Sequence, residues 1–87
     1  MKLVEIVWVD AVNYGDKYTA EEAAKMKLSE VHTVGYLLEE TDEYVKMCGD
    51  HFSHVSDRDV EQFASLSLIP KGCVKSIRVV EDDRAQS

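Results

Sequence analysis

Hydrophobic and polar positions alternate over several stretches of the chain, a period of two that is typical of β-strands. In the first stretch Val4, Ile6 and Trp8 fall on one face, and β-branched residues dominate. The pattern predicts a mainly β protein of five short strands. The stretches with this pattern are residues 2–11, 30–40, 42–48, 63–69 and 73–80.

A different signal stands between the first two stretches. Thr19 is followed three residues later by Glu22, the spacing of a capping box, and "TAEEAAKMKL" is rich in helix-forming residues. The sequence therefore predicts one short helix over about residues 19 to 27, inserted between strands one and two.

Short gaps between the later stretches predict antiparallel hairpins. Gly35 stands inside the second stretch, where it weakens a strand unless it permits a bend or a close approach of two backbones. Several stretches carry apolar residues on both faces, and a flat sheet would leave one of these faces in water. We therefore expect a small, strongly bent five-stranded barrel.

The length of 87 residues suits one small domain. We expect this domain to span residues 1–80 and residues 81–87 to form a disordered acidic tail. The polar residues 49–62 are expected to form a loop, with one irregular helical turn near residues 56–63.

The chain's single proline, Pro70, lies between the last two strands and is followed by Lys71 and Gly72. Proline cannot donate to a strand ladder, and glycine permits a tight turn, so the three residues predict a corner that redirects the last strand. Lys71 then faces either a boundary between subunits or bulk water.

Two motifs resemble those of the Sm-like family, which includes the Sm, LSm and Hfq proteins. In "VGYLLEETDEYVKM" Gly35, Asp42 and Tyr44 have the order of the family's first motif, and "LIPKGCVKSI" resembles its second, with Lys71 and Gly72 at the corner. The resemblance spans residues 34–77. It implies an Sm-like or SH3-like barrel whose open edge strands join copies into a ring.

The resemblance also implies nucleotide-contacting loops at Tyr44, Lys46, Lys71 and Gly72. Lysines supply point charges for phosphate, tyrosine a stacking face, and glycine room for close approach. Three features differ from the family pattern: a strand precedes the helix, Lys46 stands where asparagine is usual, and the chain is acidic. The alternative is that these residues are surface lysines and a turn glycine.

A second resemblance is to small acidic proteins of bacteriophages. It rests on "VEIVWVDA" at the start, "EEA" in the helix and "IPKGCVKSI" near the end. Some phage proteins of this size are oligomers that sequester cyclic nucleotide signals of host defence. The resemblance implies that class of function and assigns no residue to it.

Composition narrows the possible partners. The net charge is −7, and an acidic field repels phosphate backbones, so we expect no binding of long nucleic acid. A small anionic ligand in one local pocket stays compatible with this charge. The chain has no long apolar run, and Glu5 and Asp10 interrupt its apolar start, so we expect no membrane contact, no signal peptide and a cytoplasmic location, in the host cytoplasm if the protein is phage-encoded.

Candidate catalytic and metal residues are few. The sequence contains no nucleophile elbow and no phosphate loop, so we expect no enzyme and no cofactor. Zinc-type ligands gather at Cys48, Asp50, His51 and His54, but their spacing matches no common zinc motif and we expect no metal. Cys48 and Cys73 are expected to be reduced thiols.

Aromatic residues surround the segment after the first strand. Tyr14 and Tyr18 can stack on a nucleobase, and Lys17 can contact a phosphate. Trp8 either belongs to this set or packs in the core, and the tyrosines either bind a ligand or cap the end of the barrel.

These observations favour a non-enzymatic homo-oligomer, of phage type, that sequesters a small cyclic nucleotide. The ligand-binding candidates are Tyr14, Lys17, Tyr18, Tyr44, Lys46, Lys71 and Gly72. Two alternatives stay open: an Sm-like ring that binds RNA, and an interaction module that blocks a host protein.

Overall fold

A computed structural model describes residues 1–52 and 60–82 of the chain. The protein is mainly β, as predicted. No helix among these residues is long and apolar enough to cross a membrane. The elements of the described residues in chain order are β1 (Lys2–Asp10), α1 (Ala20–Ala24), β2 (Ser29–Glu40), β3 (Tyr44–Phe52), β4 (Gln62–Pro70), the 3-10 turn η1 (Lys71–Cys73) and β5 (Val74–Asp82).

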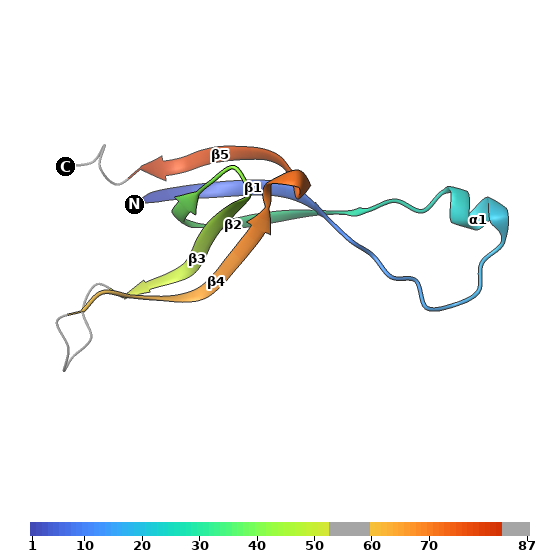
Figure 1. Cartoon of the computed structure of the whole chain (residues 1–87), viewed down its shortest axis with the longest axis horizontal. Helices are drawn as coiled ribbons and strands as arrows, with labels where there is room; N and C mark the ends of the chain where they lie inside the picture. The colour runs from blue at the N-terminus through green and yellow to red at the C-terminus, as the bar shows by residue number, and fades with distance from the viewer. Residues whose placement is uncertain (53–59, 83–87) are drawn as a thin grey trace.

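The five strands form one antiparallel sheet in the order β4-β3-β2-β1-β5 (Figure 1). Consecutive strands are neighbours, except that β5 returns to pair with β1. Within the described part of the chain no backbone ladder joins β4 to β5, so both strands keep an open edge.

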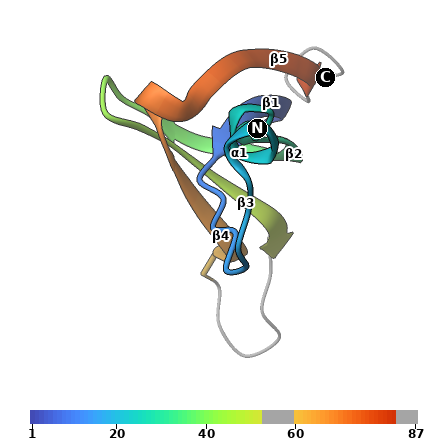
Figure 2. The same cartoon turned by 90° about the vertical axis from the view of Figure 1, so that its right-hand side faces the viewer.

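The sheet bends along β2. Residues 29–36 of β2 pair with β1, while residues 36–40 pair with β3, and Figure 2 shows β3 and β4 leaving in a different direction from β1 and β5. At Gly35 a Cβ would lie 2.6 Å from the carbonyl oxygen of Cys48 and 2.9 Å from Cε of Met47. The close approach expected at Gly35 is therefore confirmed, and it is what the missing side chain permits.

A small core fills the inside of the bend. Val4 and Ile6 of β1 meet side chains of β3 and β4, and Trp8 packs against the edge of this cluster. The Trp8 Nε1–H donates to Thr33 Oγ1 across the β1–β2 ladder at 3.0 Å, which satisfies the polar end of the ring. Trp8 thus belongs to the core face with Val4 and Ile6. The buried members of the cluster are Val4, Ile6, Val45, Met47 and Ile69.

The strands β3 and β4 pair with each other over residues that the sequence pattern assigned to a loop. Gly49–Phe52 belong to β3 instead of the loop expected over residues 49–62, because the backbone ladder continues to the pair Phe52↔Gln62. The His51 ring also stacks on Phe63 with a centroid distance of 5.1 Å. Of the helical turn expected near residues 56–63, residues 56–59 lie outside the described part of the chain, and the final two belong to β4.

Residues 11–28, called the arm below, connect β1 to β2 and carry α1 far from the sheet (Figure 1). The predicted capping box is confirmed: the Glu22 N–H donates to Thr19 Oγ1, and the Thr19 N–H donates to Glu22 Oε1, each at 3.1 Å. The helix ends at Ala24, earlier than predicted, because none of its residues is buried against another element. The chain is consequently elongated, at 58 × 29 × 21 Å.

The corner between β4 and β5 begins at Pro70, as expected. Pro70 is the last residue of β4, an edge strand, and pairs with Tyr44. Lys71–Cys73 then form η1, and the Lys71 N–H donates to the Glu43 carbonyl at 2.8 Å. Gly72 has no positive φ, so the turn does not depend on a conformation reserved for glycine. The last strand, β5, extends to Asp82, and residues 83–87 lie outside the described part of the chain.

Candidate ligand-binding site

An open pocket of about 670 Å³ lies where the arm leaves the sheet. Apolar side chains from β1 and the arm make up four of its eight lining residues, and one tyrosine and three charged residues are the others. Pockets of this size, mostly apolar with a few polar groups, are the usual form of small-molecule sites. The lining residues are Val9, Val12, Tyr14, Met26, Lys27, Leu28, Glu30 and Lys75.

The strand register places the charged wall of this pocket. Val9 and Glu30 are directly opposite each other on the β1–β2 ladder, so their side chains share one face. On the other side of β1 the pairing shifts between Val7↔Ser76 and Trp8↔Val74, which leaves Lys75 as an extra residue in β5. The Lys75 Nζ reaches Glu30 Oε2 across β1 at 2.7 Å.

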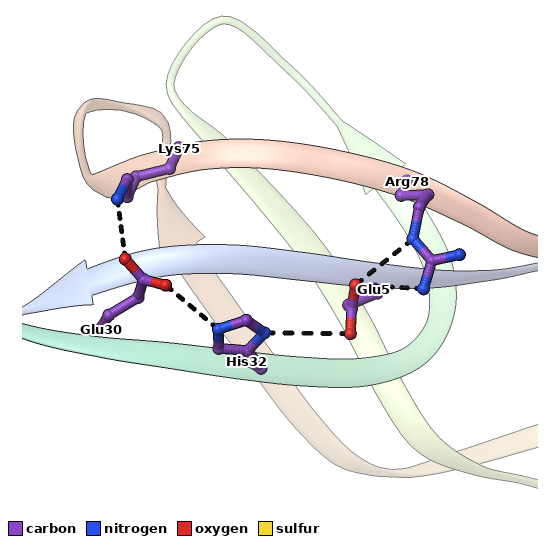
Figure 3. Close-up of polar contacts among 5 residues, drawn as sticks. All are labelled: Glu5, Glu30, His32, Lys75 and Arg78. Carbon is purple, nitrogen blue, oxygen red and sulfur yellow. Dashed lines mark hydrogen bonds and ion pairs between the residues drawn. The ribbon is translucent and has the colours of Figure 1, made fainter.

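The Lys75–Glu30 pair is the end of a polar chain on the outer face of β2, β1 and β5 (Figure 3). Glu30 Oε1 contacts His32 Nε2 at 3.1 Å, and His32 Nδ1 lies 3.9 Å from Glu5 Oε2. The other oxygen of Glu5 accepts from Arg78 Nη2 at 3.2 Å. The bond from Lys75, followed by that from His32, lowers the pKa of Glu30, so this carboxylate stays charged and holds Lys75 in the wall.

Lys27 can bind an anionic ligand in the pocket without first leaving an ion pair. Within residues 1–52 and 60–82 it has no ion-pair or hydrogen-bond partner, whereas Lys75 is bound to Glu30. Tyr14 is 46% exposed and meets Tyr18 edge to face, with ring centroids 5.9 Å apart. The pocket therefore combines apolar walls and an aromatic ring with one unpaired positive charge, a combination suited to a planar ligand that carries an anionic group.

Of the arm residues predicted from sequence, Tyr14 lines the pocket, while Lys17 and Tyr18 lie further along the arm and do not line it. Lys27 and Lys75 were missed. Lys27 follows the helix without any local motif, and Lys75 enters the wall through a bulge in β5 that no sequence pattern marks.

The other predicted residues meet at the corner. The bond from the Lys71 N–H to the Glu43 carbonyl holds η1 against the β2–β3 turn, so Lys71 and Gly72 lie near the start of β3, where Tyr44 and Lys46 stand. Nothing lies within 4 Å of the position a Gly72 Cβ would take. The structure thus separates the predicted residues into an arm group and a corner group.

Acidic side chains neutralise both lysines of the corner group. Lys71 Nζ lies 2.6 Å from Glu40 Oε2, and Lys46 Nζ lies 3.0 Å from Glu39 Oε1. The Tyr44 hydroxyl also donates to Glu39 Oε1 at 2.7 Å. Glu39 raises the pKa of Tyr44 and of Lys46 through these bonds, and the bond from Tyr44, ahead of that from Lys46, lowers the pKa of Glu39. A phosphate at this corner would have to displace these carboxylates.

The candidate zinc ligands do not form a cluster in the described part of the chain, where no three His, Cys, Asp or Glu side chains could hold a metal ion together. His54 lies outside the described residues. His51 instead contacts Glu61 at 2.7 Å, and Cys48 is buried, with its pKa raised by burial and by the charge of Asp50. Cys48 and Cys73 are free thiols.

Comparisons of the chain with protein-family models, with curated proteins and with solved structures find no match. The likeness to Sm-like proteins stays a resemblance of motifs. Function is therefore inferred from the geometry of the pocket and the sheet.

Proposed function

We propose that the protein is a non-enzymatic homo-oligomer that binds and sequesters a small nucleotide-type ligand in the pocket at the base of the arm. The observation that carries the proposal is the unpaired Lys27 beside the half-exposed Tyr14 in a mainly apolar pocket. In line with the phage resemblance, the ligand would be a cyclic nucleotide signal of host defence.

The pocket offers a distinct group to each part of such a ligand. A base would lie against Tyr14 and the apolar walls, with stacking worth about 1–3 kcal/mol by alanine substitution. Phosphate oxygens would bind Lys27 as a point charge. The Glu30 carboxylate, already fixed by Lys75, would accept N–H bonds from the edge of the base.

The acidic charge of the chain favours small anions over long ones. A net charge of −7 repels a polymer of phosphates, while a mononucleotide or dinucleotide meets only the charges near its pocket because salt screens the others beyond about 8 Å.

Thermal-shift screening against cyclic dinucleotides, cyclic trinucleotides and ADP-ribose derivatives tests the proposal. A ligand present at a hundred times its Kd stabilises the fold by about 2.7 kcal/mol, so the melting temperature should rise by several degrees. Lys27→Ala should abolish the rise. Lys25→Ala is the matched control, because Lys25 is an exposed lysine on the same arm that does not line the pocket. A flat response of the wild-type protein to the whole panel would contradict the proposal.

The finer fold that we propose is an Sm-like small barrel. The strand order β4-β3-β2-β1-β5, the turn η1 between β4 and β5, and the bend at Gly35 support it. Ring assembly through the two open edges would follow from this likeness. Light scattering that gives a strict monomer at micromolar concentration would count against any ring.

A second candidate function is binding of short single-stranded RNA at the corner group. It is favoured by one observation, the contact that brings Lys71 and Gly72 against the β2–β3 turn. It predicts salt-sensitive binding that Lys71→Ala removes. Absence of RNA binding at low salt would eliminate it, and an RNA phosphate would have to displace the carboxylates that pair with Lys46 and Lys71.

A further inference from the structure

The arm exposes apolar side chains that nothing in the described chain covers. Residues 11–25 are all exposed, and α1 buries none of its residues. A five-residue helix gains little stability in water from its own hydrogen bonds, so a partner that packs on it would stabilise it. The large apolar side chains on the arm are Val12, Tyr14, Tyr18 and Leu28, which are between 37% and 61% exposed.

The surface area of the chain exceeds that of a compact monomer. Its accessible surface is 6578 Å², against about 5,200 Å² for a compact protein of 9.9 kDa. The excess belongs to the whole elongated chain and not to the arm alone, and it is large enough to contain the roughly 800 Å² that each partner buries in an interface of standard size. The radius of gyration, 17.5 Å, also exceeds the roughly 12 Å expected for this length.

A second exposed apolar surface lies on the edge strand β4. Leu66 and Leu68 stand at alternate positions, so both point to the same face, and they are 55% and 57% exposed. The arm of the same chain extends away from the sheet (Figure 1), and Leu66 and Leu68 stay exposed. An arm of another copy is a segment that can cover this surface.

The charges favour contact between the arm of one copy and the rest of another copy, called the body below, over contact between two bodies. The arm carries three acidic and three basic residues, so its net charge is zero, and the whole net charge of −7 lies on the rest of the chain. Two bodies repel each other, whereas a neutral arm approaches an acidic body without that cost.

We propose that the arm is an intersubunit clasp: the Tyr18 side of one arm, which does not line the pocket, packs on Leu66 and Leu68 of a second copy of this chain. With the contact made in both directions, the pair has a two-fold axis and closes on itself. The inference rests on the proposed function only in taking self-association as given, and it does not depend on the ligand.

The register of the sheet provides a direct test. Asp10 and Ser29 are paired at the end of the β1–β2 ladder, so an Asn-Gly turn can replace residues 11–28 and close the hairpin. Light scattering after size exclusion should give a lower mass for this armless variant than for the wild type, and circular dichroism should show the same β signal. An unchanged mass would refute the clasp.

Point variants keep the test valid should the armless chain not fold. Tyr18→Ser on the arm, and Leu66→Ser with Leu68→Ser on β4, should each weaken association by at least tenfold. Val34→Ser is the matched control, because Val34 is 55% exposed on β2, outside the proposed contact. An equal loss in the control, or no loss in the others, would overturn the proposal.

Mixing the armless variant with the β4 variant tests the contact between arm and β4 directly. The armless variant retains the receiving surface, and the Leu66→Ser/Leu68→Ser variant retains the arm, so the two should associate with each other although neither associates with itself. Failure to associate on mixing would refute the direct contact between the two surfaces.

Ligand binding and association are separable in these variants. The Leu66→Ser/Leu68→Ser variant keeps the whole pocket and should keep the thermal shift with ligand. Lys27→Ala should lose the thermal shift and keep the oligomeric mass.

Discussion

Gly35 is the residue at which the sheet changes direction, and a single methyl group tests its role. In Gly35→Ala the Cβ would lie 2.6 Å from the Cys48 carbonyl oxygen, a backbone atom that cannot move alone. We expect a loss of about 1–3 kcal/mol in the free energy of unfolding, measured by urea denaturation. Gly15→Ala is the control, since no atom lies within 4 Å of its Cβ position, and it should leave stability unchanged or slightly raised. Equal effects at the two sites would show that the close contact is not what requires glycine.

The pH dependence of stability tests the role of Glu30. The pKa of Glu30 is lowered in the folded state, mainly by the bond from Lys75. Its contribution to stability is therefore fully present at pH values above the pKa of the unfolded state, and it is lost as the pH falls through the pKa of the folded state. Wild type should therefore exceed Glu30→Gln in urea midpoint at pH 5, and the difference should shrink towards pH 3. Glu21→Gln, in an exposed pair on α1, is the control. A difference that grows on acidification would contradict the assignment.

Single residues differ in how far their sequence context predicts them. The capping box at Thr19 and the close approach at Gly35 follow from local rules, because each depends on a short motif or on the space that one side chain would need. Lys27 and Lys75 could not be identified in this way, since their place in the pocket depends on how the arm leaves the sheet and on a register shift in β5.

At the level of elements, α1 is held by its own cap and not by packing. Thr19→Ala removes the side-chain acceptor for the Glu22 N–H and should destabilise the helix by about 1 kcal/mol. Because α1 buries nothing, we expect faster amide exchange in residues 20–24 with an unchanged urea midpoint for the monomeric chain. A lower midpoint would reveal a contact between the helix and the sheet.

The strands were predicted well where apolar residues alternate and poorly where they do not. The period of two located β1, the start of β2, and the strands β4 and β5 on either side of the corner. The antiparallel hairpin expected between these last two strands is wrong, because β4 pairs with β3 and β5 pairs with β1. It failed over Gly49–Phe52, where ladder bonds and the ring contact of His51 with Phe63 extend β3 through polar residues. The helix was predicted too long because propensity continues to Lys27 while the packing that would stabilise another turn is absent from the described chain.

For the whole molecule, the net charge sets the response of association to salt. Acidic bodies repel each other, and salt screens this repulsion, so the association constant should rise several-fold between 20 and 300 mM NaCl. Sedimentation at several protein concentrations measures it. Association that weakens with salt would point to complementary charges between the bodies, contrary to the neutral contact proposed for the arm.

The antiparallel, mainly β architecture could be predicted from sequence, and the direction of the arm could not. Strand number follows from local periodicity, and a bend follows from a glycine among apolar residues. The arm is exposed along most of its length, so no hydrophobic pattern fixes where it points. The candidate site lies at the base of this same segment, which is why sequence identified Tyr14 and missed its charged neighbours.

The pairing of Asp10 with Ser29 means that the β1–β2 ladder extends to both ends of the arm. Substitutions, insertions or deletions between these two residues need not disturb the strands on either side. The segment can therefore change in sequence or length while the strands keep their pairing, so one sheet is compatible with different arms, and with them different ligands or partners.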